Sequence, residues 1–344
     1  MNIKLKTAIT CLLCFSLCAC QDTATPGDEG LAVPVPIGFS ADIAPREETQ
    51  TRGNAITDID YMYVFASYTG TSDWTSTDIP NYMYRQLMEK TEASAWTYSP
   101  VKYWPANAGE KLSFFAYAPI TVSGIELSAL GTAGPKITYT LPAKESDKQD
   151  LLVGSRLNKK QADAAVAFSM QHALTQVKFN VKTTLSLETT GSTVILNKLE
   201  VLAPAKGTLS FNATADNSFT WNCEATRTTF TAAINDEASG KVMNGNSTVA
   251  GTFFLFPVAD LATAAVNPTL KLTYTLVKAP GTGSNIGTVS ITSTLDLDKA
   301  NWKHGNSLLY NLTIIDDRLI LEGVTVKDFP VNGDSAAGSG IPAT

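Results

Sequence analysis

The sequence predicts an all-β protein made of β-sandwiches with antiparallel sheets. Apolar and polar residues alternate in short runs, which is the pattern of half-buried strands. Clusters of Gly, Pro, Asn, Ser and Thr separate these runs, and the best helical candidates, Thr57 to Asp60 and Lys159 to Ala165, are short. A hydrophobic content of 44% with 17% charged residues supplies a buried core and excludes intrinsic disorder.

The N-terminus predicts export. Lys4 and Lys6 give a positive start, and Thr7 to Ala19 form an apolar segment too short to span a membrane. This pattern is typical of a secretory signal peptide, which we place at residues 1–19. Four of the five cysteines lie within the first 20 residues, so Cys223 has no disulfide partner within the fold.

The end of the signal, Leu17-Cys18-Ala19-Cys20, resembles the bacterial lipobox. The resemblance implies cleavage before Cys20, a diacylglyceryl thioether on its sulfur, and acylation of the new amine. Two or three acyl chains anchor a protein stably in a membrane. The alternative is ordinary cleavage near Ala19, which leaves Cys20 as a free thiol. Residues 20–32 are polar and contain Pro and Gly, which predicts a flexible tether.

The strand pattern continues through the rest of the chain. Alternating runs predict strands at Val64 to Tyr68, Leu112 to Tyr117, Val177 to Val181 and Leu270 to Leu276. Removing 19 residues from 344 leaves 325, which suggests two domains. A polar stretch after Ser155 and a shift from aromatic residues to Thr, Val and Leu predict domains at 33–165 and 166–344.

Composition narrows the classes of partner. The formal net charge is −6, and it becomes −8 when Lys4 and Lys6 are removed. The remaining basic residues form no stripe, so nucleic acid is excluded as a partner. No apolar run of 18 or more residues follows the signal, so no further helical membrane span is expected.

The sequence offers little for catalysis. His172 and His304 have no Cys, Asp or Glu at ligand spacing, and Cys223 lies in a strand-like setting typical of a small buried hydrophobe. The adjacent acids Glu47-Glu48 and Asp316-Asp317 fall in expected linkers or turns. We therefore predict no enzyme activity, no metal and no cofactor. An aromatic cluster between Trp74 and Trp104 fits a core better than a carbohydrate platform, although flat rings do stack on sugars.

Several segments in order carry a family resemblance. They are Ile37-Gly38-Phe39-Ser40, Thr51-Arg52-Gly53-Asn54-Ala55, Tyr103-Trp104-Pro105, Leu112 to Pro119, Asp150-Leu151-Leu152-Val153, Val166 to Val181 and Trp302 to Leu312. Together they resemble the fimbrillins, the pilins of type V pili in Bacteroidetes. Two positions depart from the family pattern: Gly53, where Ala is common, and Phe329, where Trp is common.

The resemblance implies two transthyretin-like β-sandwich domains and a lipoprotein of the outer membrane and cell surface. It also implies assembly by strand exchange with other pilin subunits, of the same or another kind, after an Arg-specific surface protease cuts between Arg52 and Gly53. The expected role is adhesion, with host or bacterial glycans or proteins as further partners. The alternative is a monomeric surface lipoprotein that binds glycans.

The strand-exchange hypothesis names two segments. Val33, Val35, Ile37 and Phe39 form one apolar face of the strand to be displaced. The donor segment runs from Leu319 to Val331 and offers four apolar side chains for burial in a neighbour: Leu319, Leu321, Val324 and Val326.

Overall fold

The fold is given by a computed structural model. It describes residues 33–44, 56–147, 149–163, 165–185, 190–234, 240–243, 245–246, 248–261, 267–278, 287–315, 318–328 and 341–342. The chain divides into two units, Met1–Pro34 and Val35–Thr344, and the second holds all the described strands.

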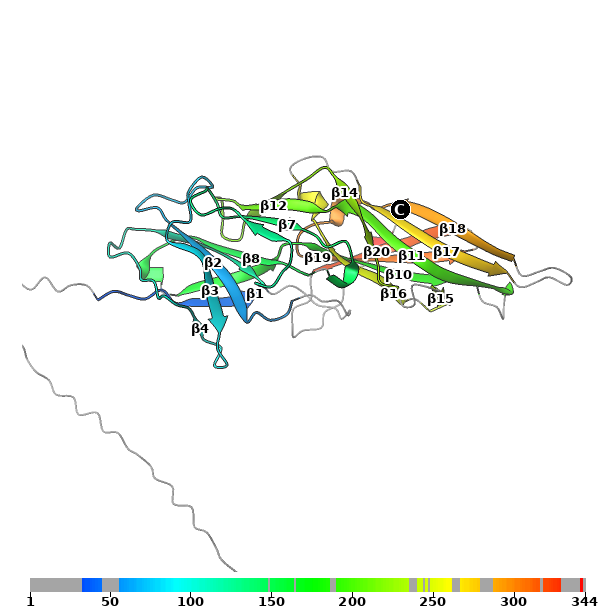
Figure 1. The fold of residues 1–344 in the computed structure, drawn as a ribbon, viewed down its shortest axis with the longest axis horizontal. Coiled ribbons are helices and arrows are strands. Elements are labelled where there is room, and N and C mark those ends of the chain that lie inside the picture. Colours follow the sequence, from blue (N-terminus) through cyan, green and yellow to red (C-terminus); the bar gives the residue numbers. More distant parts are fainter. Residues whose placement is uncertain are drawn as a thin grey trace, which may run out of the picture. The chain divides into compact units, whose positions relative to one another are not determined.

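The described residues form strands joined by turns (Figure 1). The strands are β1 Phe39–Ile43, β2 Tyr61–Tyr68, β3 Met83–Lys90, β4 Trp96–Thr97, β5 Leu112–Ala118, β6 Ile125–Leu127, β7 Lys136–Thr140, β8 Leu152–Lys159, β9 Val166–His172, β10 Thr175–Thr183, β11 Ser192–Pro204, β12 Lys206–Phe211, β13 Phe219–Cys223, β14 Arg227–Thr231, β15 Lys241–Met243, β16 Thr248–Leu255, β17 Thr269–Lys278, β18 Gly287–Asp296, β19 Asn306–Ile315, β20 Arg318–Asp328 and β21 Ile341–Pro342. The all-β prediction is confirmed.

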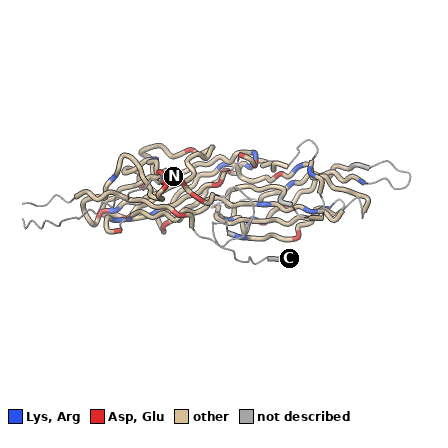
Figure 2. The backbone as a smooth tube through the Cα atoms, turned by 90° about the horizontal axis from the view of Figure 1, so that it is seen from below, with Lys and Arg blue, Asp and Glu red and all other residues tan. Residues whose placement is uncertain are grey.

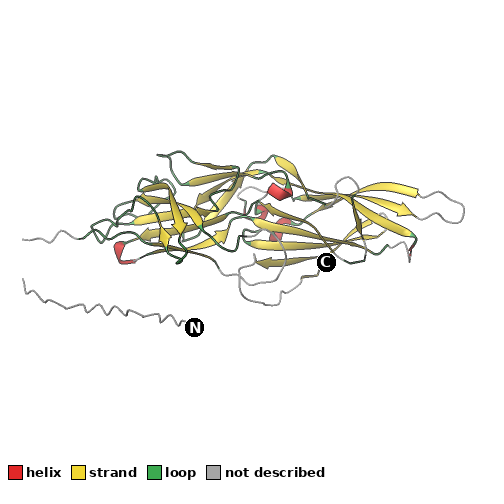
Figure 3. Cartoon of the chain, turned by 60° about the horizontal axis from the view of Figure 1, so that its bottom comes forward, coloured by secondary structure: helices red, strands yellow, loops and turns green. Residues whose placement is uncertain are grey.

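Apart from the single residue Thr190, helical structure in the described part is limited to short 3-10 turns (Figure 3). The sequence expectation of a helix at Thr57 to Asp60 is wrong, because these residues form no helix and end in a bend at Asp60. The expectation at Lys159 to Ala165 reduces to the turn Gln161–Asp163. No described helix has the length and apolar character needed to cross a membrane.

The strands form four sheets. A seven-stranded sheet has the order β1-β9-β8-β5-β2-β3-β4, and a four-stranded sheet has the order β13-β12-β7-β6. Two five-stranded sheets contain β16-β10-β19-β20-β21 in one and β14-β11-β17-β18 with β15 in the other. Most pairings are antiparallel, as expected, but β1 pairs with β9 and β10 with β19 in parallel.

The sheets face one another in pairs across one continuous core. Phe115 of β5 lies 4.9 Å from Phe211 of β12, ring centre to ring centre, so the seven- and four-stranded sheets are packed together. A Cβ at Gly251 of β16 would lie 3.6 Å from Leu199 of β11, so the two five-stranded sheets are also in contact. Aromatic rings of this size contribute most of the buried area of such cores.

The strand pairing crosses residue 165. Strand β9, which follows this position, belongs to the seven-stranded sheet, and β12 pairs with β7. Residues 166–172 and 206–223 are therefore grouped with strands from the N-terminal half. The division into domains at 33–165 and 166–344 stays a prediction.

A second core lies on the other face of the seven-stranded sheet. Alternate residues of β2 point to opposite faces, so Phe65 enters the large core while Met62 and Val64 enter the second one. Every residue of β5 is buried for the same reason, since both of its faces are covered. The second core is closed at its edge by β1 and the residues just before it, Val35 to Ile43, which we call the β1 segment; Ile37 and Phe39 supply part of the apolar surface of this core.

Positions of Lys and Arg are interspersed with positions of Asp and Glu along the described backbone (Figure 2).

Candidate functional site

The segment around β1 lies between two neighbours. On one side Phe39–Ile43 runs parallel to β9, and Val166 N donates to Gly38 O at 2.8 Å. On the other side Ile37 N donates to Lys102 O at 2.9 Å, and Trp104 N donates to Val35 O at 2.8 Å. The segment therefore closes the gap between β9 and the chain that follows β4.

A tyrosine hydroxyl adds to this closure. Tyr98 donates to Ile37 O at 2.9 Å and lies 3.2 Å from Lys102 O. Burial raises the pKa of the Tyr98 hydroxyl, so it stays protonated as a donor at neutral pH.

The side chains of this segment fill the second core. Ile37, Phe39 and Ala41 are 2%, 7% and 9% exposed. The Phe39 ring lies 5.3 Å from Tyr98, 5.7 Å from Phe114 and 6.3 Å from Phe168, measured between ring centres. Removing the segment would uncover an apolar floor formed by residues on β5 and β9.

The expected apolar face is shorter than the sequence suggests. Ile37 and Phe39 are buried, but Val33 is 83% exposed and Val35 is 40% exposed. Pro34 and Pro36 have no N–H to donate, so a continuous ladder begins only after them. The buried face of this segment therefore consists of Ile37, Phe39 and Ala41, and not of Val33 and Val35 as the alternation had predicted.

Three predicted site residues lie outside the described residues. These are Cys20, Arg52 and Gly53. The first described residue after them is Ile56, whose N–H donates to Oδ2 of Asp150 at 3.3 Å.

Asp150 and His172 form a buried pair that the sequence reasoning missed. Nδ1 of His172 lies 2.6 Å from Oδ2 of Asp150, and the two residues are 4% and 1% exposed. Asp150 Oδ1 also accepts from Leu151 N at 2.8 Å. A buried carboxylate is costly unless it is paired, so this pair fixes the end of β9 against the start of β8. The signal was present, because both residues lie in segments that carried the family resemblance.

The predicted donor residues lie in β20. This strand pairs with β19 from Ile315 and Arg318 to Asn306 and Asp328, with a bulge opposite Asn311 and Leu312. Glu322 is the extra residue, so side chains on both sides of the bulge reach the same face. The side chains that share this face pack half-buried against the chain's own core: Leu319, Leu321, Val324 and Val326.

The described residues hold no cluster of three or more His, Cys, Asp or Glu side chains suited to a metal. Burial raises the pKa of the Cys223 thiol to about 12, which makes it a poor nucleophile. Trp74 and Trp104 are 2% and 6% exposed, so these members of the aromatic cluster belong to the core.

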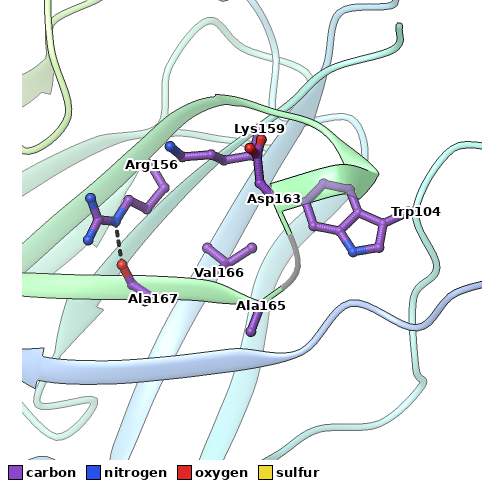
Figure 4. A pocket seen from close by; sticks show the side chains of 7 residues that line it. All are labelled: Trp104, Arg156, Lys159, Asp163, Ala165, Val166 and Ala167. Carbon is purple, nitrogen blue, oxygen red and sulfur yellow. Dashed lines mark hydrogen bonds between the residues drawn. The ribbon is translucent and has the colours of Figure 1, made fainter. Parts of the chain in front are cut away.

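A cavity of about 220 Å³ lies beside this site (Figure 4). Its lining comes from β8, from the start of β9, from the connection between them and from one tryptophan: Arg156, Lys159, Asp163, Ala165, Val166, Ala167 and Trp104. A Cβ at Gly38 would lie 3.6 Å from Ala165, so the cavity wall is next to the β1 segment.

The comparisons agree with this architecture. A family model described as fimbrillin-like matches residues 49–328. The chain belongs to the fimbrillin-like family. No curated protein sequence matches the chain at a significant level.

Solved structures of low sequence identity share the fold. A fimbrial protein from Bacteroides vulgatus matches with a TM-score of 0.62 and 21% identity, over 85% of this chain and 99% of that one. A candidate cell adhesion protein from Bacteroides eggerthii matches with a TM-score of 0.51 and 13% identity, over 87% of this chain and 98% of that one.

Family membership fixes the class of protein. The fimbrillin-like family consists of structural proteins of cell-surface fimbriae rather than enzymes, which agrees with the prediction that this chain has no catalytic role. Its expected partners are other pilin subunits.

Proposed function

We propose that this protein is a structural subunit of a cell-surface fimbria and that it assembles by strand exchange after proteolysis. The observation that supports this most is the position of the β1 segment. It closes the second core with Ile37 and Phe39, and its bonds to Lys102 and Trp104 make it the bridge between two edges. Release of such a strand leaves an apolar floor and unpaired backbone, which favour addition of a strand from another chain.

The proposed sequence of events begins with export as a lipoprotein anchored through Cys20. An Arg-specific protease then cuts after Arg52, which separates the lipid and the β1 segment from the rest of the chain. Ile56, bonded to buried Asp150, holds the chain just after the cut in place. The segment from Leu319 to Val331 of a second subunit then enters the vacated track.

Donation of β20 to a second subunit costs the donor part of its own core packing. Four apolar side chains of β20 already cover the chain's own core, so donation exchanges an intramolecular partner for an intermolecular one: Leu319, Leu321, Val324 and Val326. Such an exchange is favourable when the vacated track gains more burial than the donor sheet loses.

The test compares two arginines of the same polar run. The purified full chain is treated with an Arg-specific protease and followed by mass spectrometry and electron microscopy. We expect cleavage after Arg52 and polymers in the wild type and in Arg46→Ala, but neither in the double variant Arg46→Ala/Arg52→Ala, which has no arginine between β1 and Ile56. Polymers of equal length in the double variant would refute the mechanism.

A second control truncates the chain after Asp317. This removes β20 and uncovers the core beneath it, so the variant must first be shown to fold by circular dichroism. A folded truncation that still polymerises would refute the assignment of the donor segment. A cut wild-type protein that stays monomeric would favour a terminal subunit or the glycan-binding alternative.

A further inference from the structure

Strands β8 and β9 are joined at one end only. Their pairing consists of Leu152 with His172 and Val153 with Gln171. Beyond these residues the strands diverge, and the cavity of about 220 Å³ lies in the split between them (Figure 4).

The turn between β12 and β13 occupies the edge of β8 that β9 leaves open. Ser155 N donates to Asn217 Oδ1 at 2.9 Å, and Asn217 N donates back to Ser155 Oγ at 2.8 Å. Leu157 N donates to Asp216 Oδ1 at 2.7 Å. Side chains of this turn therefore satisfy the backbone donors that a neighbouring strand would otherwise bond.

Asp216 is held in this position by two cations of β8. Arg156 Nη1 lies 3.1 Å and Lys159 Nζ 3.6 Å from Asp216 Oδ2. Arg156 also donates through Nε to Ala167 O, so its side chain spans the split from β8 to β9 (Figure 4). Asn217 adopts a φ of 60°, a left-handed conformation that Asn tolerates better than most residues.

The separation of β9 from β8 becomes important after β1 has been released. Strand β9 has β1 as its partner along Val166 to Met170 and meets β8 in ladder pairs only near His172. Loss of β1 removes the ladder that holds β9 in place along Val166 to Met170. The opposite edge of β9, where Ala167 O accepts from Arg156, already faces β8, and closure of this edge onto β8 would draw β9 away from the vacated track.

We propose that the β12–β13 turn, through Asp216 and Asn217, is a spacer that keeps β9 apart from β8 so that the track left by β1 stays open to a strand of a second subunit. This inference rests on the proposed function, and it names the residues that keep the vacated track able to bind a strand of a second subunit.

The test measures return of the first strand. The full chain is cut with an Arg-specific protease, freed of its N-terminal fragment by gel filtration, and titrated with a labelled synthetic peptide of residues 33–52. The variant combines Asp216→Ala with Asn217→Gly, because glycine keeps the left-handed conformation without strain. The matched control is Asp163→Ala, because Asp163 lines the same cavity but accepts from Lys160 N, at 2.7 Å, in the connection that follows β8.

We expect the cut wild type and the control to bind the peptide with equal affinity, and the double variant to bind at least ten-fold more weakly. We also expect hydrogen exchange of β9 to be at least ten-fold slower in the cut double variant, because β9 then pairs with β8. Equal affinity and equal exchange in all three proteins would overturn the spacer role.

Two further outcomes are informative. If the double variant does not fold before cleavage, Asn217→Gly alone removes the Oδ1 acceptor of Ser155 N and is expected to weaken peptide binding by at least three-fold; unchanged binding would overturn the proposal. If the cut wild type itself does not bind the peptide, the proposed acceptor track fails, and the spacer fails with it. If the wild type binds the peptide and the variants bind it equally well, the spacer role is refuted and the acceptor track is not.

Discussion

The two strands named by the exchange hypothesis are held very differently. Strand β1 pairs with β9 over five residues, and prolines precede it. Strand β20 pairs with β19 from Arg318 to Asp328, and its bulge is fixed by Glu322, which accepts from Thr313 at 2.6 Å and lies 2.7 Å from Lys182. The first strand is therefore the easier one to release, and cleavage beside it acts on the strand with the shorter ladder of the two.

The comparison also separates packing from pairing. Phe39 is more deeply buried than the apolar residues of β20, which are half-buried. Strand β1 thus combines a short ladder with strong side-chain burial. Such a strand is stable while it is tethered, and its departure leaves an apolar floor ready for a replacement.

The largest effect is expected from Phe39→Ala. Loss of a buried phenylalanine costs about 3 kcal/mol in the free energy of unfolding of the uncut chain. The N-terminal fragment should also leave faster after cleavage. The matched change Leu321→Ala should cost about 2 kcal/mol and leave fragment release unchanged, because Leu321 is half-buried in β20. Denaturant unfolding and fragment release by gel filtration measure both. Equal release rates in the two variants would contradict the comparison.

A smaller effect is expected from Asp150→Asn. The change removes the charge that faces His172 and weakens the bond to Ile56, which should lower the free energy of unfolding by about 2 kcal/mol. Asp58→Asn is the control, since Asp58 forms an exposed pair with Lys90 and should change stability by less than about 0.5 kcal/mol. Denaturant unfolding of both variants checks this, and equal losses would show that the buried pair contributes nothing special.

Tyr98→Phe removes one hydrogen bond to the β1 segment. We expect a loss of about 1 kcal/mol and faster release of the cut fragment. Tyr68→Phe removes a surface bond to Glu110 and should leave release unchanged. Release rates that respond equally to both changes would argue against Tyr98 as a specific contact to the first strand.

The smallest effect is expected in the stability of the fold at low pH, through Glu322 of β20. The hydrogen bond from Lys182 lowers the pKa of Glu322, so this carboxylate stabilises the fold above its unfolded pKa, and the contribution is lost as pH falls through the lower folded value. Solvent screening at this half-exposed pair limits the effect to about 0.5 kcal/mol. Lys182→Met should flatten the stability profile below about pH 4.5, near the ordinary pKa of a glutamate. A stability profile identical to that of the wild type would show that the Lys182–Glu322 pair does not contribute to the pH dependence of stability.

Much of the fold could be predicted from the sequence because strand alternation is a local signal. The runs around Val64, Phe114, Val177 and Leu272 all became strands. The parallel pairing of β1 with β9 could not be predicted, because it joins residues more than one hundred positions apart and leaves no local pattern.

The candidate site was predictable in part. Ile37 and Phe39 were identified by alternation, whereas the exposure of Val33 and Val35 depends on where the ladder begins. Asp150 and His172 lie 22 positions apart, and nothing in their spacing shows that the fold brings them to 2.6 Å. Sequence motifs marked both residues but gave no reason to pair them.

Assembly in the presence of the released strand tests the central claim most directly. The full chain is cut after Arg52 and its polymers are counted by electron microscopy, with and without a large excess of the peptide of residues 33–52. If a second subunit enters the track of β1, the peptide occupies that track and polymers become short or absent. Polymers of unchanged length in the presence of saturating peptide would show that subunits join elsewhere.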